Sequence, residues 1–418
     1  MLAIISVLLV FVLIHFSIEL IKFGNESKNY KNDYAELHSV KYGMFNSDAW
    51  TSKITEVIED KIDNFALNLD NRDEIEGYVN TIIDTLIVET ERIVKERNKG
   101  EDGFINNIMG STKQIITDSI IDFQDLHKRV PEFTSAVMVE IEKPENQRRA
   151  KKVLREKLKE FMKSTFKITT DMSKYNVLLD KYSSPNLLDQ KIQDHSNKMN
   201  AHMLKILLIA AAIILLVILQ GVLNSLSLFS LATTTLSLLV TGVMMPMLDI
   251  EAKITKLYFI VLEQPIIFEN QILFFQSKSI FDLLILLLES AEAKMIFVGV
   301  LLVMFSIIFP LLKLMASMLY FYSLGRVGNN IVTRFFALYS TKWSMADVMV
   351  VSMFMAYLGL DGVVESELRK LETQGDPVNI VTFNGTHLEV GFFLFLGFVF
   401  TSFVLSILIE KNRKNRED

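Results

Sequence analysis

Long apolar runs at the N-terminus and in the second half of the chain constrain the fold more than any other feature. A helix needs about 20 predominantly apolar residues to cross the hydrocarbon core of a bilayer. Runs of that kind occur at Leu2–Leu20, Leu204–Val222, Phe229–Leu248, Met295–Ser323, Ser344–Leu360 and Val390–Ile409. Half of all residues are hydrophobic, yet 22% are charged, and the charge gathers in residues 21–202. The sequence therefore predicts a membrane protein whose polar part is separate from its spans.

The fold class expected from these runs is mainly α: a polytopic α-helical membrane protein with six spans. Residues 1–20 form an N-terminal membrane anchor, because they lack the basic start and small-residue cleavage site of a signal peptide. In residues 21–202, apolar residues recur at helical spacing, which predicts a helical domain. The rest divides into a second span at 203–224, a four-helix membrane module at 225–412 and a basic tail at 413–418. Asn224-Ser225 is expected to break spans two and three into a hairpin, with one very long helix as the alternative.

Basic residues at the ends of the spans predict the orientation. They follow the last span at Lys411, Arg413, Lys414 and Arg416, and they lie between spans four and five at Arg326, Arg334 and Lys342. Basic loops are retained in the cytoplasm. With six spans, both termini are then cytoplasmic and residues 21–202 are extracytoplasmic.

The two loops expected on the outer side contain strand signals. Ile254–Leu262 and Ile272–Gln276 are extended, aromatic-rich runs, and Val378–Phe383 leads through Asn384-Gly385 into Thr386–Val390. Asn-Gly is typical of a tight hairpin turn. These runs predict a small outer β-sheet that joins both loops. Between them, Ser279 and Asp282 have capping-box spacing and should begin a short apolar helix that ends near Ser290.

Several functional classes lack their sequence signatures. The chain has no cysteine, which excludes disulfides, Cys-ligated zinc and thiol catalysis. It has no P-loop, no GxSxG and no HExxH motif, so we expect no enzyme and no nucleotide binding. The net charge of -6 gives no reason to expect a nucleic-acid partner. No catalytic residue, metal ligand or cofactor is predicted.

Polar residues inside the apolar spans are the candidates for function. Lys313 lies deep in span four, either snorkelling toward the cytoplasmic interface or paired inside the bundle, because an unpaired charge there is costly. Thr401 and Ser402 of span six lie at a similar depth, where they could complete a polar cluster or bond to their own helix backbone. Pro310 and Pro246 are predicted to kink their helices.

The start of span five offers a partner for Lys313. Ser344 and Asp347 have capping-box spacing, so Asp347 could cap the helix, pair with Lys313, or do both. Lys342 and Trp343 precede them, and both are expected to anchor the chain at the membrane interface.

The run Lys342–Val348, continuing to Val350-Val351, resembles the signature of the paraquat-inducible protein A (LetA-like) family. In that family the preceding helix has a Pro-x-x-Lys-Leu element, matched by Pro310, Lys313 and Leu314. Further matches are Thr401 in the last helix and Pro246 near the outer end of the module's first helix. The resemblance extends over about residues 225–412.

The chain also departs from the family pattern. Many members have cysteine-rich zinc ribbons and two membrane modules, whereas this chain has no cysteine and one module. Met349 replaces a usual Phe, and Gly359 stands where the family often has Lys. The first anchor and the polar domain have no counterpart in the resemblance.

The resemblance implies a function and a location. It implies a subunit of the bacterial inner membrane that moves membrane lipids between the bilayer and a partner protein whose MCE domains form a tunnel across the envelope. Lys313, Asp347 and Thr401 would then form a polar relay for transport. One alternative is a scaffold without transport, whose outer helical domain organises a partner complex. Another is an ion-coupled transporter of small molecules, for which a four-helix module with one acidic site is small.

Overall fold

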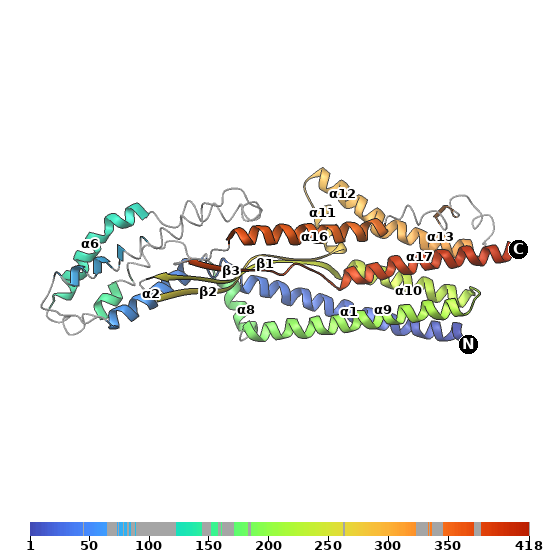
Figure 1. The fold of residues 1–418 in the computed structure, drawn as a ribbon, viewed down its shortest axis with the longest axis horizontal. Helices are drawn as coiled ribbons and strands as arrows, with labels where there is room; N and C mark the ends of the chain where they lie inside the picture. The colour runs from blue at the N-terminus through green and yellow to red at the C-terminus, as the bar shows by residue number, and fades with distance from the viewer. Residues whose placement is uncertain are drawn as a thin grey trace.

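The fold is that of a computed structural model, and it is elongated (Figure 1). The structure describes residues 1–44, 46–64, 123–143, 152–157, 171–182, 185–261, 264–322, 346–371 and 378–417, with isolated residues between 73 and 88 and at 160, 333, 335 and 336. A bundle of long helices makes up one end, and a narrow sheet connects it to shorter helices, including α2 and α6, at the other end.

The helices follow in chain order. They are α1 (Leu2–Leu37), α2 (Ser47–Asn64), α6 (Phe123–Ile141), α8 (Ser173–Tyr182), α9 (Pro185–Leu219), α10 (Ser225–Met244), α11 (Ile280–Leu288), α12 (Ala293–Val303), α13 (Phe309–Tyr322), α16 (Ala346–Leu371) and α17 (Val390–Glu417). A π-helical turn, η2 (Met304–Ile308), joins α12 to α13. The strands are β1 (Pro246–Val261), β2 (Gln264–Ser279), β3 (Val378–Asn384) and β4 (His387–Leu388).

The predicted fold class and the six spans are confirmed. Six helical stretches are long and apolar enough to cross a membrane, and they coincide with the six runs found in the sequence. The two ends of the chain lie at the same end of the molecule, as an even number of crossings requires (Figure 1). The polypeptide is therefore a multi-pass membrane protein.

Helix α1 is longer than the predicted anchor, because one buried stripe continues through it. The buried positions follow a spacing of three and four residues: Ser6, Val10, Leu13, Ser17, Leu20, Gly24, Ser27 and Lys31. Residues at this spacing share one face of a helix. Its small residues allow α10 to approach closely, and Ser6 and Ser17 contact Ser230 and Ser237 of α10 through hydroxyl pairs of 3.1 Å. The stripe thus joins α1 to the membrane module.

A second face of α1 packs against α9, which begins at Pro185 rather than near residue 203. Glu19 and Glu26, seven residues apart, meet His202 and His195 of α9 with nitrogen–oxygen distances of 3.3 and 3.1 Å. Phe23 lies between these pairs and contacts both imidazole rings edge-on. The two helices therefore form one antiparallel hairpin that continues beyond the apolar runs into the polar part of the chain.

The predicted small sheet is present and antiparallel, with β1 in its centre. Strand β1 pairs with β2 on one side, and on the other side it pairs with β3 and then with β4. The expected hairpin at Asn384-Gly385 was wrong. β3 and β4 do not pair with each other but lie one after the other along the same edge of β1. Asn384 instead donates hydrogen bonds to the backbone and carboxylate of Asp361 on α16, and Gly385 donates its N–H to Glu251 O at 2.9 Å.

Two expectations about the helices next to the sheet had different outcomes. The capping box at the start of α11 is confirmed, with Ser279 and Asp282 each accepting a hydrogen bond from the other's backbone N–H. Helix α16 continues well beyond the predicted end of span five near Leu360. Its last turns leave the apolar stretch and pack Val364 and Leu368 against Ala252 of β1.

The predicted kink at Pro246 was also wrong. Helix α10 ends at Met244, and Pro246 is the first residue of β1, where a proline ring costs no helical hydrogen bond. The chain turns here next to the start of α17, where Gly391 packs against the backbone of Met245 and Pro246. A Cβ atom at Gly391 would lie 2.4 Å from Met245 O and 2.6 Å from Pro246 O.

We expect Gly391→Ala to destabilise the protein by about 1–3 kcal/mol, because backbone atoms cannot yield as a flexible side chain can. Chemical unfolding in one detergent would measure this change. Gly359→Ala is the matched control, since nothing lies within 4 Å of a Cβ at that glycine. Equal losses in both variants would contradict the argument.

Candidate functional site

The first candidate site is a polar group inside the helical bundle, around Lys313. The Lys313 side chain is 4% exposed, and its Nζ donates a hydrogen bond to Ser402 Oγ at 2.9 Å. Thr401 next to it donates to its own helix, at Gly397 O with 2.7 Å. One predicted partner is therefore in place, and Thr401 takes the backbone alternative. A buried ammonium group in an apolar bundle is a common mark of function in membrane proteins.

The helix that holds Lys313 is irregular one turn before it. Pro310 has no N–H for the carbonyl of Ser306, and the chain widens into the π turn η2, in which the Phe309 N–H bonds to Met304 O. Ser306 is fully buried, and its hydroxyl contacts Met349 Sδ of α16 at 3.3 Å. π turns of this kind occur often at functional sites.

The other predicted residues of this site cannot be placed. Lys342, Trp343 and Ser344 lie outside the described residues. Asp347 is in the first turn of α16, but its side chain is not among those that the structure describes. The pairing of Lys313 with Asp347 therefore stays a prediction.

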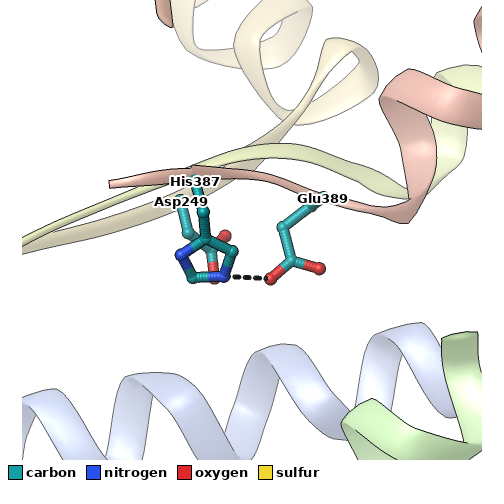
Figure 2. A group of neighbouring side chains, drawn as sticks. All are labelled: Asp249, His387 and Glu389. Atoms are coloured by element: carbon teal, nitrogen blue, oxygen red, sulfur yellow. Dashed lines mark hydrogen bonds and ion pairs between the residues drawn. The ribbon is translucent and has the colours of Figure 1, made fainter. Parts of the chain in front are cut away.

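A second polar cluster lies where the sheet meets the bundle, and the sequence analysis missed it. This sheet-side cluster consists of Lys31, Asp249, His387 and Glu389. Lys31 Nζ on α1 lies 2.6 Å from Asp249 Oδ2 on β1 and 2.5 Å from Glu389 Oε1, just before α17. The imidazole of His387 on β4 bonds to Glu389 through Nε2 at 3.0 Å. Figure 2 shows the Asp249, His387 and Glu389 side chains pointing from the sheet toward α1.

The cluster has the donor set of a metal site but already contains a cation. The ligand atoms of Asp249, His387 and Glu389 lie within 4.8 Å of one another. Lys31 Nζ lies between the two carboxylates at hydrogen-bond distance. A divalent ion would have to displace this ammonium group from a buried position, so the geometry favours an ion-pair cluster.

Burial and charge shift the titration of the cluster. Burial, followed by the nearby charge of Glu389, raises the pKa of Asp249 to about 6. Burial also acts to raise the pKa of Glu389, but hydrogen bonds and charge from His387 and Lys31 outweigh it, so this pKa is below its ordinary value. The hydrogen bond to Glu389 raises the pKa of His387 to about 9 despite partial burial.

The raised pKa of His387 predicts a pH dependence of stability. Because the folded pKa is above the unfolded one, the stabilisation is complete below about pH 6.5 and is lost as the pH rises through about 9. The free energy of unfolding in detergent should therefore decrease as the pH rises from about 6.5 to about 9. His387→Gln should remove that part of the profile, and a mutant profile that keeps the same decline would contradict it.

Two sequence signals could have revealed the sheet-side cluster. Small or apolar residues recur at spacings of three and four from Ser6 through Leu20 to Gly24 and Ser27, and the next position on this helix face is Lys31. Asp249 follows span three and Glu389 precedes span six, and the predicted topology places both on the same side of the membrane. A lysine and two acids at one depth are an expected ion pair.

These features define the class: a polytopic α-helical membrane protein with a small antiparallel sheet and a buried lysine in its bundle. The family model described as paraquat-inducible protein A matches residues 257–369. The matched stretch runs from within β1 through most of α16 and contains Pro310, Lys313 and Asp347. It supports the family resemblance for the membrane module, over a shorter range than residues 225–412. No curated protein and no solved structure matches the chain.

Proposed function

We propose that this protein is a bacterial inner-membrane subunit that moves lipid between the bilayer and a partner MCE-domain tunnel, without enzymatic activity. The main support is that the family match and the buried Lys313 coincide on one segment. We place both termini in the cytoplasm. The sheet and the helices beyond it then lie outside the cytoplasm, where they meet the partner.

The mechanism assigned to the bundle depends on the cost of burying charge. Lys313 is held by Ser402 of α17, and the helix that carries it contains a π turn and a proline. A change of protonation near Lys313 would alter its pairing. The π turn η2, directly before α13, is a position at which the helix can adjust to that change. Asp347 is the acid that we assign to this step, and Thr401 lies beside Ser402.

Replacing Asp347 with asparagine tests the proposal. We expect transfer of a labelled phospholipid from proteoliposomes to be abolished, because asparagine keeps the size of the side chain but cannot carry the charge. Yield and unfolding temperature should stay close to wild type, since asparagine also caps helices. Unchanged transfer in the folded variant would refute the relay and favour the scaffold alternative.

A further inference from the structure

The sheet-side cluster balances two cations against two anions. The hydrogen-bond partners of His387 show its charge: Nδ1 lies 2.7 Å from Gly385 O, and Nε2 lies 3.0 Å from Glu389 Oε1. Both ring nitrogens face acceptors, so both carry a proton and the ring is an imidazolium. Together with Lys31 it neutralises Asp249 and Glu389. Any further proton leaves the buried cluster with one positive charge in excess.

The two carboxylates are compensated unequally. Glu389 Oε1 accepts hydrogen bonds from two charged donors, Lys31 and His387, whereas the charged donor to Asp249 is Lys31. His387 Nε2 lies 3.9 Å from Asp249 Oδ2, beyond hydrogen-bond distance. Asp249 is 1% exposed, and among the described residues its Oδ1 has no hydrogen-bond partner. A buried, half-satisfied carboxylate beside a second carboxylate is the one that takes a proton first.

We propose that Asp249 is a proton-binding site that controls how firmly α1 is held by the sheet and by α17. When Asp249 is ionised, Lys31 bridges β1 and the start of α17. When Asp249 binds a proton from the aqueous phase on the sheet side, Lys31 keeps only Glu389, which it shares with His387. The hold on α1 is then weaker, and the α1–α9 hairpin loosens from the module. This inference does not depend on lipid transport.

The surroundings of Asp249 contain few other groups that titrate. Lys31 faces it from α1, Glu389 from the start of α17 and His387 from β4. Ser277 lies opposite Asp249 on β2, and its buried hydroxyl acts to lower the pKa of Asp249, against the larger effect of burial. Other charges on α1 and β1 form pairs of their own. These pairs are Glu251 with Lys253 on β1, and Lys28 of α1 with Asp282 of α11.

The cluster determines both how closely water approaches Asp249 and the pH range in which this carboxylate titrates. The His387 side chain beside Asp249 is 57% exposed, so water reaches the edge of the cluster. Because burial raises the pKa of Asp249 to about 6, the site responds to mild acid rather than to extreme pH. The step is a proton transfer from the aqueous phase to the carboxylate of Asp249, with no oxidation or reduction.

Spin labels on the full chain test the proposal directly. The chain has no cysteine, so Asn32→Cys on α1 and Ser366→Cys on α16, both exposed, provide the only thiols. Pulsed electron resonance in nanodiscs should give a narrow distance distribution at pH 8 that broadens with a midpoint near pH 6. With Asp249→Asn the distribution should be broad at every pH. The matched control Glu251→Gln, which changes a carboxylate two residues away, should follow the wild type.

A second variant keeps the test decisive if Asp249→Asn does not fold. His387→Gln changes an exposed side chain and removes a positive charge near Asp249. The midpoint of the pH-dependent broadening should therefore rise by about one pH unit. An unchanged midpoint would overturn the proposal. So would a wild-type distribution that does not depend on pH, an Asp249→Asn variant that still titrates, or an equal loss of titration in Glu251→Gln.

Discussion

Replacing Lys31 with methionine is expected to lower the free energy of unfolding by about 3–5 kcal/mol, the largest stability effect that we predict for a single substitution. Lys31 is the ammonium group between Asp249 and Glu389, and all three side chains are buried. Methionine keeps the length of the side chain but leaves two carboxylates close together in a site that water hardly reaches. His387 compensates only one of them.

Denaturant unfolding of the full chain in one detergent measures this loss. Lys28→Met is the matched control, because Lys28 lies one turn earlier on α1 and pairs with Asp282 in a more exposed position. Its loss should be about 1 kcal/mol or less. Adding Asp249→Asn to Lys31→Met should restore part of the stability, since it removes the uncompensated carboxylate. Similar losses for Lys28→Met and Lys31→Met would contradict this account of the sheet-side cluster.

Replacing Lys313 with methionine is expected to reduce lipid transfer by at least about tenfold without loss of folded protein. A tenfold lower rate corresponds to an activation free energy that is higher by about 1.4 kcal/mol. This is a modest effect for removing a buried charge that takes part in transport. Folded yield should stay close to wild type, because an apolar side chain fits the bundle and Ser402 can bond to its own helix backbone. Asp347, in the first turn of α16, keeps its predicted alternative role as a helix cap. Transfer of a labelled phospholipid between reconstituted vesicles measures the effect.

The control for Lys313 is Ser317→Ala, one turn further along the same helix at a position equally buried. It changes a polar group in the same environment without touching the lysine, so transfer should stay within about twofold of wild type. If Lys313→Met and Ser317→Ala behave alike, the lysine has no special role in transport. If Lys313→Met instead unfolds the protein, the ammonium group is structural.

The membrane spans were predictable from the sequence because their signal is local. A run of about 20 apolar residues has few stable alternatives to a spanning helix. The capping box at Ser279 is equally local and was correctly predicted. Lys313 was singled out because a charge inside an apolar run is visible without any knowledge of packing, and Ser402 was named as a possible neighbour.

The failures concern contacts between distant segments. Pro246 was interpreted as a kink because the apolar pattern continues to Leu248, whereas pairing with β2 over the whole strand outweighs that local helix signal. Asn384-Gly385 has the residues of a hairpin turn, but the backbone of β1 binds both flanking strands and prevents them from pairing. The sheet-side cluster joins positions 31, 249 and 389, and no window of sequence contains all three.

Purification of the full chain from native membrane, followed by mass analysis of the bound lipids and proteins, tests the central proposal most directly. The account predicts phospholipid bound well above the level found on an unrelated six-span protein purified in the same way, together with a partner that contains MCE domains. A preparation with lipid at the control level and no such partner would contradict it.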